Sequence, residues 1–392
     1  MKQVRVAVIG VGNMGSAHAK MLAAGEIPGA VLAAVCDIRP ARLDWARGAL
    51  GGNIKTFDDA QKLMESGCAD AVIVATPHYL HPVLGIEALR HGLHLLVEKP
   101  EGVYTKQVKE LNAAAERAAK EKGLVFGVMF NQRTNPLYRK ARDLVRSGEL
   151  GELRRTNWII TDWFRTQSYY DSGGWRATWA GEGGGVLMNQ SPHQLDLWQW
   201  ICGMPARVRG FCKNGAFHRI EVEDDVTAYV EYPNGATGVF VTSTGDTPGT
   251  NRFEITGENG KLLIENDALT FWRNRIPSGR FIREAEDGFE KPEVWKCEIP
   301  SPGDNPQHAG ILKNWTSAIL TGAPLLAPGE EGIRGVTLCN AIYLSSWTDQ
   351  WVTLPLDDAL YYRLLQEKIA SSTFRKETSD KTFDLAGTYS GS

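Results

Sequence analysis

The sequence of 392 residues lacks the features that would assign it to a membrane or to nucleic acid. It contains no apolar run of the roughly 20 residues that a membrane span requires, and no apolar signal segment precedes its first apolar run at residues 6–9. Its formal net charge is −3, so it has no excess of basic residues for nucleic acid or anionic lipid. We therefore expect a cytoplasmic protein with neither of these partners.

Cysteine and histidine are too sparse to indicate a disulfide framework or a metal centre. The six cysteines form no C-x-x-C pair, so we expect reduced and mostly buried thiols. His78 and His81, like His91 and His94, have the spacing of metal ligands, but no cluster supplying a third ligand accompanies either pair. We expect no metal.

Glycine, by contrast, is concentrated where the first apolar run ends. Val6-Ala7-Val8-Ile9 has the length of a strand, and a G-x-G-x-x-G pattern follows it at residues 10–15. At a strand-to-helix turn this pattern lets backbone N–H groups hold the pyrophosphate of a dinucleotide. The expected contacts are Gly10, Gly12, Asn13, Met14 and Gly15.

An acidic residue follows the second predicted strand, residues 31–36. Asp37 stands about twenty residues beyond the glycine pattern, where a carboxylate binds the ribose hydroxyls of adenosine. Its charge would repel a 2′-phosphate, so we predict NAD rather than NADP as the cofactor. Arg39 and Arg42 argue for NADP, because an arginine beyond the acid can accommodate that phosphate. Arg39 is included among the cofactor contacts.

Strand and helix patterns alternate over the first third of the chain. Apolar runs at residues 71–75 and 94–97 are typical of buried parallel strands, and helical patterns cover residues 39–50, 79–90 and 105–122. This alternation predicts an α/β fold with a doubly wound parallel sheet over residues 1–130. Ligands bind beyond the carboxyl ends of such strands, where Thr76, Pro77, Glu98 and Asn131 stand.

The pattern changes after about residue 130. Long alternating segments at residues 153–163, 226–232, 236–244 and 253–256 predict an antiparallel sheet, with a tight hairpin turn at Pro233-Asn234-Gly235. Helical patterns cover residues 135–147, 307–320 and 329–346. We predict an α+β domain over residues 131–370, and a polar tail or arm over residues 371–392.

Four further motifs carry a resemblance to a known family. They are Ala75-Thr76-Pro77 with His81, then Glu98-Lys99-Pro100, then Trp175-Arg176, and the run from Gly183 through Asn189-Gln190-Ser191-Pro192-His193 to Asp196. With the glycine pattern, they resemble the glucose–fructose oxidoreductase/inositol dehydrogenase (Gfo/Idh/MocA) family over nearly the whole chain.

The resemblance implies a Rossmann domain followed by an α+β domain on an open, mainly antiparallel sheet. It also implies a homodimer or homotetramer, and reversible hydride transfer between a sugar or cyclitol hydroxyl carbon and a nicotinamide. The expected cofactor contacts then include His81 with Thr76, Pro77, Glu98 and Asn131. The peptide bond between Lys99 and Pro100 is expected to be cis.

Lys99 and His193 are the candidate catalytic residues, because alcohol oxidation needs a group that takes the hydroxyl proton. The family usually has aspartate where this chain has Asn189, and glycine where it has Ser191. We expect Asn189 on the same helical face as His193, one turn before it. Because an amide cannot stabilise an imidazolium as a carboxylate can, His193 is predicted to be neutral at pH 7. Asp196 either supplies the missing charge or has a packing role.

Aromatic residues and fixed donors beyond residue 150 suit a sugar ring. Eleven of the twelve tryptophans lie there. The candidate substrate contacts are Arg133, Trp163, Arg165, Trp175, Arg176, Asn189 and His308, for a sugar, a glycoside (with a glucoside oxidised at C3 as one reading) or a cyclitol.

Two alternatives remain open from the residues alone. One is a redox glycosidase of the same fold, in which NAD is reduced only transiently and the aglycone is released. The other is a regulatory protein that binds nicotinamide without turnover, which would leave Lys99 and His193 unexplained.

Overall fold

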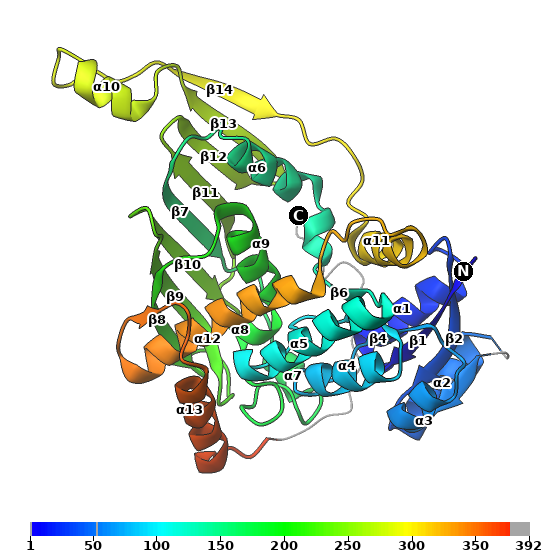
Figure 1. Cartoon of the computed structure of the whole chain (residues 1–392). Coiled ribbons are helices and arrows are strands. Elements are labelled where there is room, and N and C mark those ends of the chain that lie inside the picture. The colour runs from blue at the N-terminus through cyan, green and yellow to red at the C-terminus, as the bar shows by residue number, and fades with distance from the viewer. Residues whose placement is uncertain (1, 52–53, 377–392) are drawn as a thin grey trace.

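The computed structural model describes residues 2–51 and 54–376, and its N-terminal part is built on a parallel sheet (Figure 1). The six strands lie in the order β3-β2-β1-β4-β5-β6. The central strands read as unbroken apolar runs because helices cover both faces of the sheet, and all four residues of β4 are buried. The strands are β1 (Val4–Ile9), β2 (Ala30–Cys36), β3 (Lys55–Phe57), β4 (Ala71–Val74), β5 (His94–Val97) and β6 (Phe126–Val128).

Helices alternate with these strands, as the sequence pattern predicts. They are α1 (Asn13–Ala23), α2 (Pro40–Ala49), α3 (Ala60–Glu65), α4 (Leu80–Arg90) and α5 (Thr105–Lys122). The doubly wound Rossmann arrangement is therefore confirmed. Its strands end at the edge where Gly10, Thr76 and Glu98 stand, next to the second domain.

The second domain contains a mixed sheet of nine strands in the order β14-β13-β12-β11-β7-β10-β9-β8-β15. All neighbouring pairs are antiparallel except β7 and β10, which are parallel. The predicted hairpin at Pro233-Asn234-Gly235 joins β9 to β10. The strands are β7 (Leu153–Ile160), β8 (Arg207–Asn214), β9 (Glu223–Glu231), β10 (Thr237–Ser243), β11 (Asn251–Gly257), β12 (Gly260–Glu265), β13 (Ala268–Asn274), β14 (Val294–Ile299) and β15 (Val352–Thr353).

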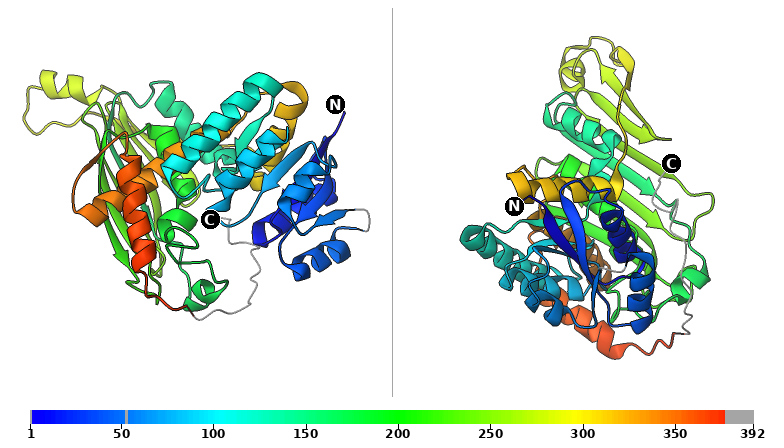
Figure 2. Two further views of the ribbon diagram at one scale, coloured as in Figure 1. Left: turned by 60° about the horizontal axis from the view of Figure 1, so that its bottom comes forward. Right: turned by 90° about the vertical axis from the view of Figure 1, so that its right-hand side faces the viewer.

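Helices cover one face of this sheet and connect it to the Rossmann domain. Figure 1 shows α6, α9 and α12 lying across the sheet, and α10 extending beyond the end of β13 and β14. Both turned views in Figure 2 show α10 extended in the same way. The helices are η1 (Asn131–Thr134), α6 (Pro136–Arg146), α7 (Gln167–Asp171), α8 (Val186–Asn189), α9 (Pro192–Cys202), α10 (Ser278–Glu284), α11 (Gln307–Thr321), η2 (Gly329–Glu331), α12 (Gly332–Thr348) and α13 (Asp358–Ser371).

One late helix returns to the first domain. Ile311, Leu312 and Trp315 of α11 are buried in the same apolar core as Val4, Val6 and Val8 of β1. The sequence division at residue 130 assigns α11 to the second domain, but its packing surface is the Rossmann sheet. A division by sequence range alone therefore separates α11 from the core that it completes.

The end of the described chain lies against the second domain. Lys376 Nζ donates hydrogen bonds to the carbonyls of Gly173 (2.6 Å) and Arg176 (2.8 Å). Residues 372–376 of the predicted tail are thus placed on a loop of the candidate site, and residues 377–392 lie outside the described residues.

Candidate active site

The glycine loop fits a bound pyrophosphate because its backbone is closely packed on one side and open on the other. A Cβ at Gly15 would lie 1.8 Å from the Gly10 carbonyl oxygen, so this position needs glycine for the helix to approach the strand. A Cβ at Gly12 would meet nothing within 4 Å. No side chain caps α1 and its first turn holds no acid, so its positive N-terminus is available to a phosphate.

Asp37 lies beside this loop, at the end of β2. Its Oδ2 accepts a hydrogen bond from Val11 N (3.0 Å), and its Oδ1 accepts one from Arg39 N (2.9 Å). The Arg39 side chain is largely exposed, and its Nε lies 3.5 Å from Asp37 Oδ1. The carboxylate is thus held next to the glycine loop, with Arg39 on its outer side.

Thr76 and His81 differ in their suitability as cofactor contacts. Thr76 Oγ1 is buried and has no hydrogen-bond partner among the described residues, so a ligand would satisfy it. Both ring nitrogens of His81 instead face backbone carbonyls, of Pro100 (2.7 Å) and of Thr76 (2.6 Å). His81 therefore joins two loops, which corrects the expectation that it contacts the cofactor directly. The Lys99–Pro100 bond is cis, as predicted.

Glu98 forms the floor of the site with two histidines. Its Oε1 lies 2.6 Å from His18 Nε2, and the His18 and His308 ring centroids are 5.7 Å apart. Burial alone would raise the pKa of Glu98, but the His18 hydrogen bond and the nearby charges of His18, His308 and Lys99 lower it to about 2. His308 thus belongs to the cluster around Glu98. His18 is absent from the residues that the sequence singled out.

Asn131 also lies at this edge of the sheet. Its Nδ2 donates to Gln307 Oε1, whereas its Oδ1 is buried without a hydrogen-bond partner among the described residues. Like Thr76 Oγ1, this acceptor is suited to a bound cofactor. The polar atoms at the strand ends therefore fit a dinucleotide.

Lys99 and His193 come together at the domain boundary. Lys99 Nζ donates to the Asn189 backbone carbonyl at 2.9 Å. Burial lowers the pKa of Lys99, and the neighbouring carboxylates of Glu98 and Glu182 oppose this effect. His193 is 5% exposed, and neither ring nitrogen has a hydrogen-bond partner among the described residues. Burial and then the charge of Lys99 hold the pKa of His193 well below its ordinary value, so the ring is neutral at pH 7.

The expected face shared by Asn189 and His193 is wrong. Helix α8 ends at Asn189 and α9 begins at Pro192, so the two residues do not lie on one continuous helix. Pro192 can begin a helix but cannot continue one without losing a backbone hydrogen bond. The Asn189 amide instead donates to Glu182 Oε1, a carboxylate that the sequence interpretation overlooked although it directly precedes the glycine run.

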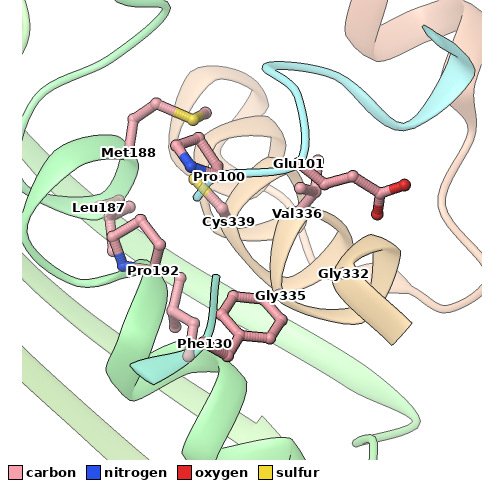
Figure 3. A pocket seen from close by; sticks show the side chains of 11 residues that line it. Pro100, Glu101, Phe130, Leu187, Met188, Pro192, Gly332, Gly335, Val336 and Cys339 are labelled. Carbon is pink, nitrogen blue, oxygen red and sulfur yellow. The ribbon is translucent and has the colours of Figure 1, made fainter. Parts of the chain in front are cut away.

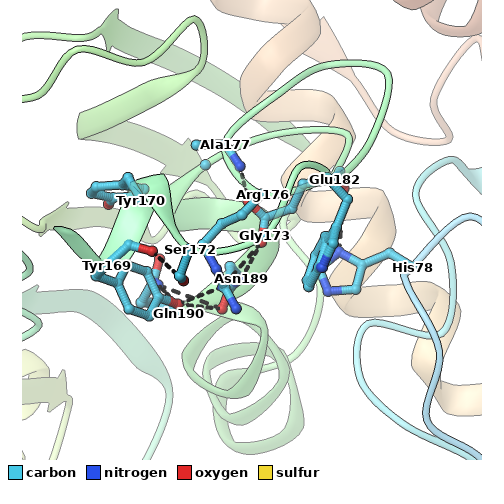
Figure 4. Close-up of polar contacts among 12 residues, drawn as sticks. His78, Tyr169, Tyr170, Ser172, Gly173, Arg176, Ala177, Glu182, Asn189 and Gln190 are labelled. Atoms are coloured by element: carbon cyan, nitrogen blue, oxygen red, sulfur yellow. Dashed lines mark hydrogen bonds and ion pairs between the residues drawn. The ribbon is translucent and has the colours of Figure 1, made fainter. Parts of the chain in front are cut away.

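Arginine and aromatic side chains surround Asn189 (Figure 4). Arg176 Nη1 donates to the Tyr169 hydroxyl (2.7 Å), and its guanidinium lies 4.4 Å from the Tyr169 ring centroid. The guanidinium is also 4.8 Å from the Trp175 ring, whose edge packs on His78. These contacts place Trp175 and Arg176 near Asn189, and their role as substrate contacts stays a prediction.

Arg165 and Trp163 lie at the outer side of the same cluster. The Arg165 guanidinium is 5.2 Å from the Tyr169 ring centroid and 5.8 Å from that of Trp163. Its Nη1 donates to the Phe164 carbonyl at 2.9 Å. Tyr169 therefore joins the two predicted arginines in one aromatic and cationic wall.

Arg133 is not part of this wall. It is 0% exposed, and its Nε and Nη2 donate to both carboxylate oxygens of Asp196 at 2.8 and 2.6 Å. Its Nη1 donates to the Leu326 carbonyl and to Glu331. This pairing corrects the assignment of Arg133 to substrate binding. It also uses Asp196, which therefore does not compensate for the missing aspartate at position 189.

A small, mainly apolar cavity lies between the loop at Pro100 and helices α9 and α12 (Figure 3). Leu187, Met188, Val336 and Cys339 line it together with Pro100. Glu101 also lines the cavity, and its two carboxyl oxygens are buried without a hydrogen-bond partner among the described residues. The rest of the lining is apolar, as in the packing between two domains. Over the described ranges, no group of three or more His, Cys, Asp or Glu residues is placed to hold a metal ion. No helix in those ranges is long and apolar enough to cross a membrane.

Comparisons with known proteins agree with this geometry. A family model described as an oxidoreductase family with an NAD-binding Rossmann fold matches residues 4–130, and the GFO/IDH/MocA C-terminal domain matches residues 138–263. Scyllo-inositol 2-dehydrogenase (NAD(+)) of Bacillus subtilis is 30% identical over 272 residues, which cover 67% of this chain and 74% of that protein. Levoglucosan dehydrogenase of Pseudarthrobacter phenanthrenivorans is 25% identical, covering 91% of this chain and 99% of that protein.

A solved structure shares the fold over almost the full chain. The WlbA dehydrogenase of Bordetella pertussis, in complex with NADH and UDP-GlcNAcA, aligns with a TM-score of 0.74 and 26% identity, covering 91% of this chain and 100% of that one. The glycine loop, Asp37 and the unpartnered acceptors at the strand ends define an NAD-dependent oxidoreductase. The chain belongs to the GFO/IDH/MocA family.

Proposed function

We propose that the protein transfers a hydride between NAD and a secondary hydroxyl carbon of a sugar, a glycoside or a cyclitol, with Lys99 and His193 as the catalytic residues. The observation that carries the proposal is the buried ring of His193. Its two nitrogens have no hydrogen-bond partner among the described residues, and it lies near the ammonium of Lys99. A buried polar side chain left in this way is suited to a ligand.

The two residues divide the proton chemistry between them. His193 is neutral at pH 7 because burial lowers its pKa, so it can accept the proton of the substrate hydroxyl. Lys99 donates a charge-assisted hydrogen bond to the same oxygen and stabilises its developing negative charge. NAD, when bound, supplies the hydride acceptor.

The wall beyond these residues suits a polyhydroxylated ring. Tyr169 and Trp175 offer aromatic faces, while Arg176 and Asn189 offer donors in fixed positions. The names of the relatives support the same class of substrate, since one acts on scyllo-inositol and another on levoglucosan.

The test is an incubation of the purified protein with NAD and a panel of hexoses, cyclitols and glycosides, with NMR analysis of the products. We expect the absorbance of reduced nicotinamide to rise with at least one substrate, and the rise to be lost in His193→Ala. Release of an aglycone without net reduction of NAD would indicate a redox glycosidase instead. Binding of NAD with neither result across the panel would indicate a regulatory protein.

We further propose a homodimer or homotetramer that assembles through the nine-stranded sheet, in a protein of the cytoplasm. Ile159 of β7, Phe211 of β8 and Trp272 of β13 are exposed large apolar side chains on these strands. Association would remove such surface from water. Multi-angle light scattering gives the mass directly, and a monomer at micromolar concentration would contradict the assembly.

A further inference from the structure

Glu182 is a buried carboxylate whose contacts all lie within the candidate site. It is 1% exposed and stands on the loop that leads into α8. Its Oε2 accepts a hydrogen bond from Ala177 N at 2.6 Å, and its Oε1 accepts one from the Asn189 side-chain amide. Arg176 Nη1 lies 3.6 Å from the same Oε1 (Figure 4).

We propose that Glu182 is a positioning residue that acts on Lys99 through Asn189. It fixes the side-chain amide of Asn189, and its carboxylate supplies a negative charge beside Arg176 and Asn189. The inference rests on the proposed function, in which Lys99 binds the reacting oxygen. It adds a residue that does not touch that oxygen and acts on it through Asn189 and Lys99.

The chain of contacts from Glu182 to Lys99 is short. Lys99 Nζ donates to the backbone carbonyl of Asn189, and the side chain of the same Asn189 donates to Glu182. Asn189 is therefore held at both ends, by an ammonium on its backbone and by a carboxylate on its amide. A change at Glu182 releases the amide end and lets the carbonyl that positions Lys99 move with it.

The same carboxylate fixes how the amide is presented. Because Nδ2 donates to Glu182, Oδ1 of Asn189 faces the opposite side, where the Tyr169 hydroxyl lies 3.5 Å away. Tyr169 in turn accepts the hydrogen bond of Arg176. Glu182 thus fixes which side of the Asn189 amide donates and which side accepts. The hydrogen bonds continue from there to Tyr169 and Arg176, which are expected to hold the sugar.

Charge gives Glu182 a second effect. Burial raises the pKa of Glu182 above its ordinary value, although Arg176, the Ala177 N–H and the Asn189 amide favour the carboxylate and oppose part of this rise. Together with the carboxylate of Glu98, its negative charge favours the ammonium form of Lys99, against burial and the nearby Arg176 and Arg165. Removal of this charge is therefore expected to lower the pKa of Lys99.

An isosteric exchange of the pair separates this role from simple packing. Glu182→Gln leaves two amides, Asn189→Asp leaves two carboxylates in contact, and the double variant Glu182→Gln/Asn189→Asp restores one amide and one carboxylate in reverse order. Glu221→Gln is the matched control, because Glu221 holds the same loop through Trp179 N (2.8 Å) and no hydrogen bond joins it to Asn189.

The readout is the pKa of Lys99, measured by competitive acetylation over a range of pH with peptide mass spectrometry. This measurement needs no turnover. We expect Glu182→Gln to lower the half-maximal pH by about 0.5–1, and the double variant to return it toward the wild-type value. Glu221→Gln is expected to leave it unchanged. NAD affinity and Tm verify that each variant is folded.

Turnover supplies the second readout. The substrate is the one that the wild type turns over best. With it, we expect kcat of Glu182→Gln to be about tenfold or more below that of the wild type, and the double variant to recover at least about threefold of that loss. An unchanged pKa of Lys99 in Glu182→Gln, or a double variant no better than the worse single variant, would overturn the inference. If the wild type turns over nothing while the pKa of Lys99 still follows the charge at position 182, the proposed function fails and the link between Glu182 and Lys99 stands.

Discussion

Replacement of Arg133 by methionine is expected to lower the stability of the fold while leaving substrate binding intact. The guanidinium is fully buried and makes a bidentate pair with Asp196, with Nε–Oδ2 and Nη2–Oδ1 distances of 2.8 and 2.6 Å. It also stacks on Trp200, with 5.1 Å from its central carbon to the ring centroid. Arg133→Met keeps much of the apolar volume but removes the charge.

The size of the stability loss follows from the buried carboxylate that remains when Arg133 is removed. Without Arg133, the 1% exposed Asp196 keeps only the hydrogen bond from Gln199 Nε2 at 2.9 Å among its described side-chain donors. Breaking a buried ion pair by removing one partner costs about 3–5 kcal/mol, because a charge stays buried without its partner. Glu331 is partly exposed and adds little to this cost. We expect a loss of about 3–4 kcal/mol and, for a chain of 392 residues, a Tm lower by about 4–5 °C.

The assay combines urea unfolding with steady-state kinetics below the transition. The double variant Arg133→Met/Asp196→Leu removes both charges and is expected to lose less than about 2 kcal/mol, so the two changes are not additive. Arg142→Met is the control, since Arg142 stacks on the same Trp200 ring but donates to the Trp200 carbonyl. A KM for the sugar that rises more than about tenfold in Arg133→Met, with unchanged stability, would show instead that Arg133 binds the substrate.

Four further outcomes are expected. Lys99→Ala should lose at least about a hundredfold in kcat with NAD affinity retained, measured by steady-state kinetics and fluorescence titration; weaker NAD binding with unchanged kcat would make Lys99 a cofactor residue. His193→Ala should lose about a hundredfold or more in kcat and its pH–rate profile should lose the limb that belongs to the imidazole; an unaltered profile would make Lys99 the base. The kcat/KM with NAD should exceed that with NADP by about tenfold or more, and Asp37→Ser should narrow the ratio; equal values in the wild type would contradict the role of Asp37. Glu98→Gln should cost about 3 kcal/mol of stability at pH 7, because the pKa of Glu98 is lowered to about 2; that contribution is present above the unfolded pKa and is lost as the pH falls to about 2, so urea unfolding of the two proteins should converge there.

The fold could be predicted from the sequence where periodicity and turn residues act locally. The parallel sheet followed from apolar runs that end at Gly10, Asp37 and Thr76, and the β9–β10 hairpin followed from Pro233-Asn234-Gly235. The packing of α11 on the first domain could not be found in this way. Its apolar face is compatible with either core, and only the three-dimensional arrangement decides between them.

The same distinction separates the site residues that the sequence could predict from those that it could not. Lys99 and the glycine loop stand at strand ends, where the topology fixes the position of a residue. Arg133 also follows a strand, but the side chain turns inward to Asp196, a partner 63 residues away in the sequence. Glu182 was overlooked because its contact with Asn189 depends on a loop in which Ala177 adopts a positive φ of 56°. No sequence spacing specifies that conformation.

The proposed reaction is direct hydride transfer between the substrate carbon and NAD. It is tested by incubating the protein and NAD with the best substrate, labelled with deuterium at one carbinol carbon at a time, and by analysing the nicotinamide by NMR. We expect deuterium from one labelled carbon to appear on the nicotinamide ring of the reduced cofactor, and His193→Ala to abolish the transfer. Reduced cofactor without deuterium from any labelled position, or NAD that stays oxidised with every sugar and cyclitol tested, would contradict it.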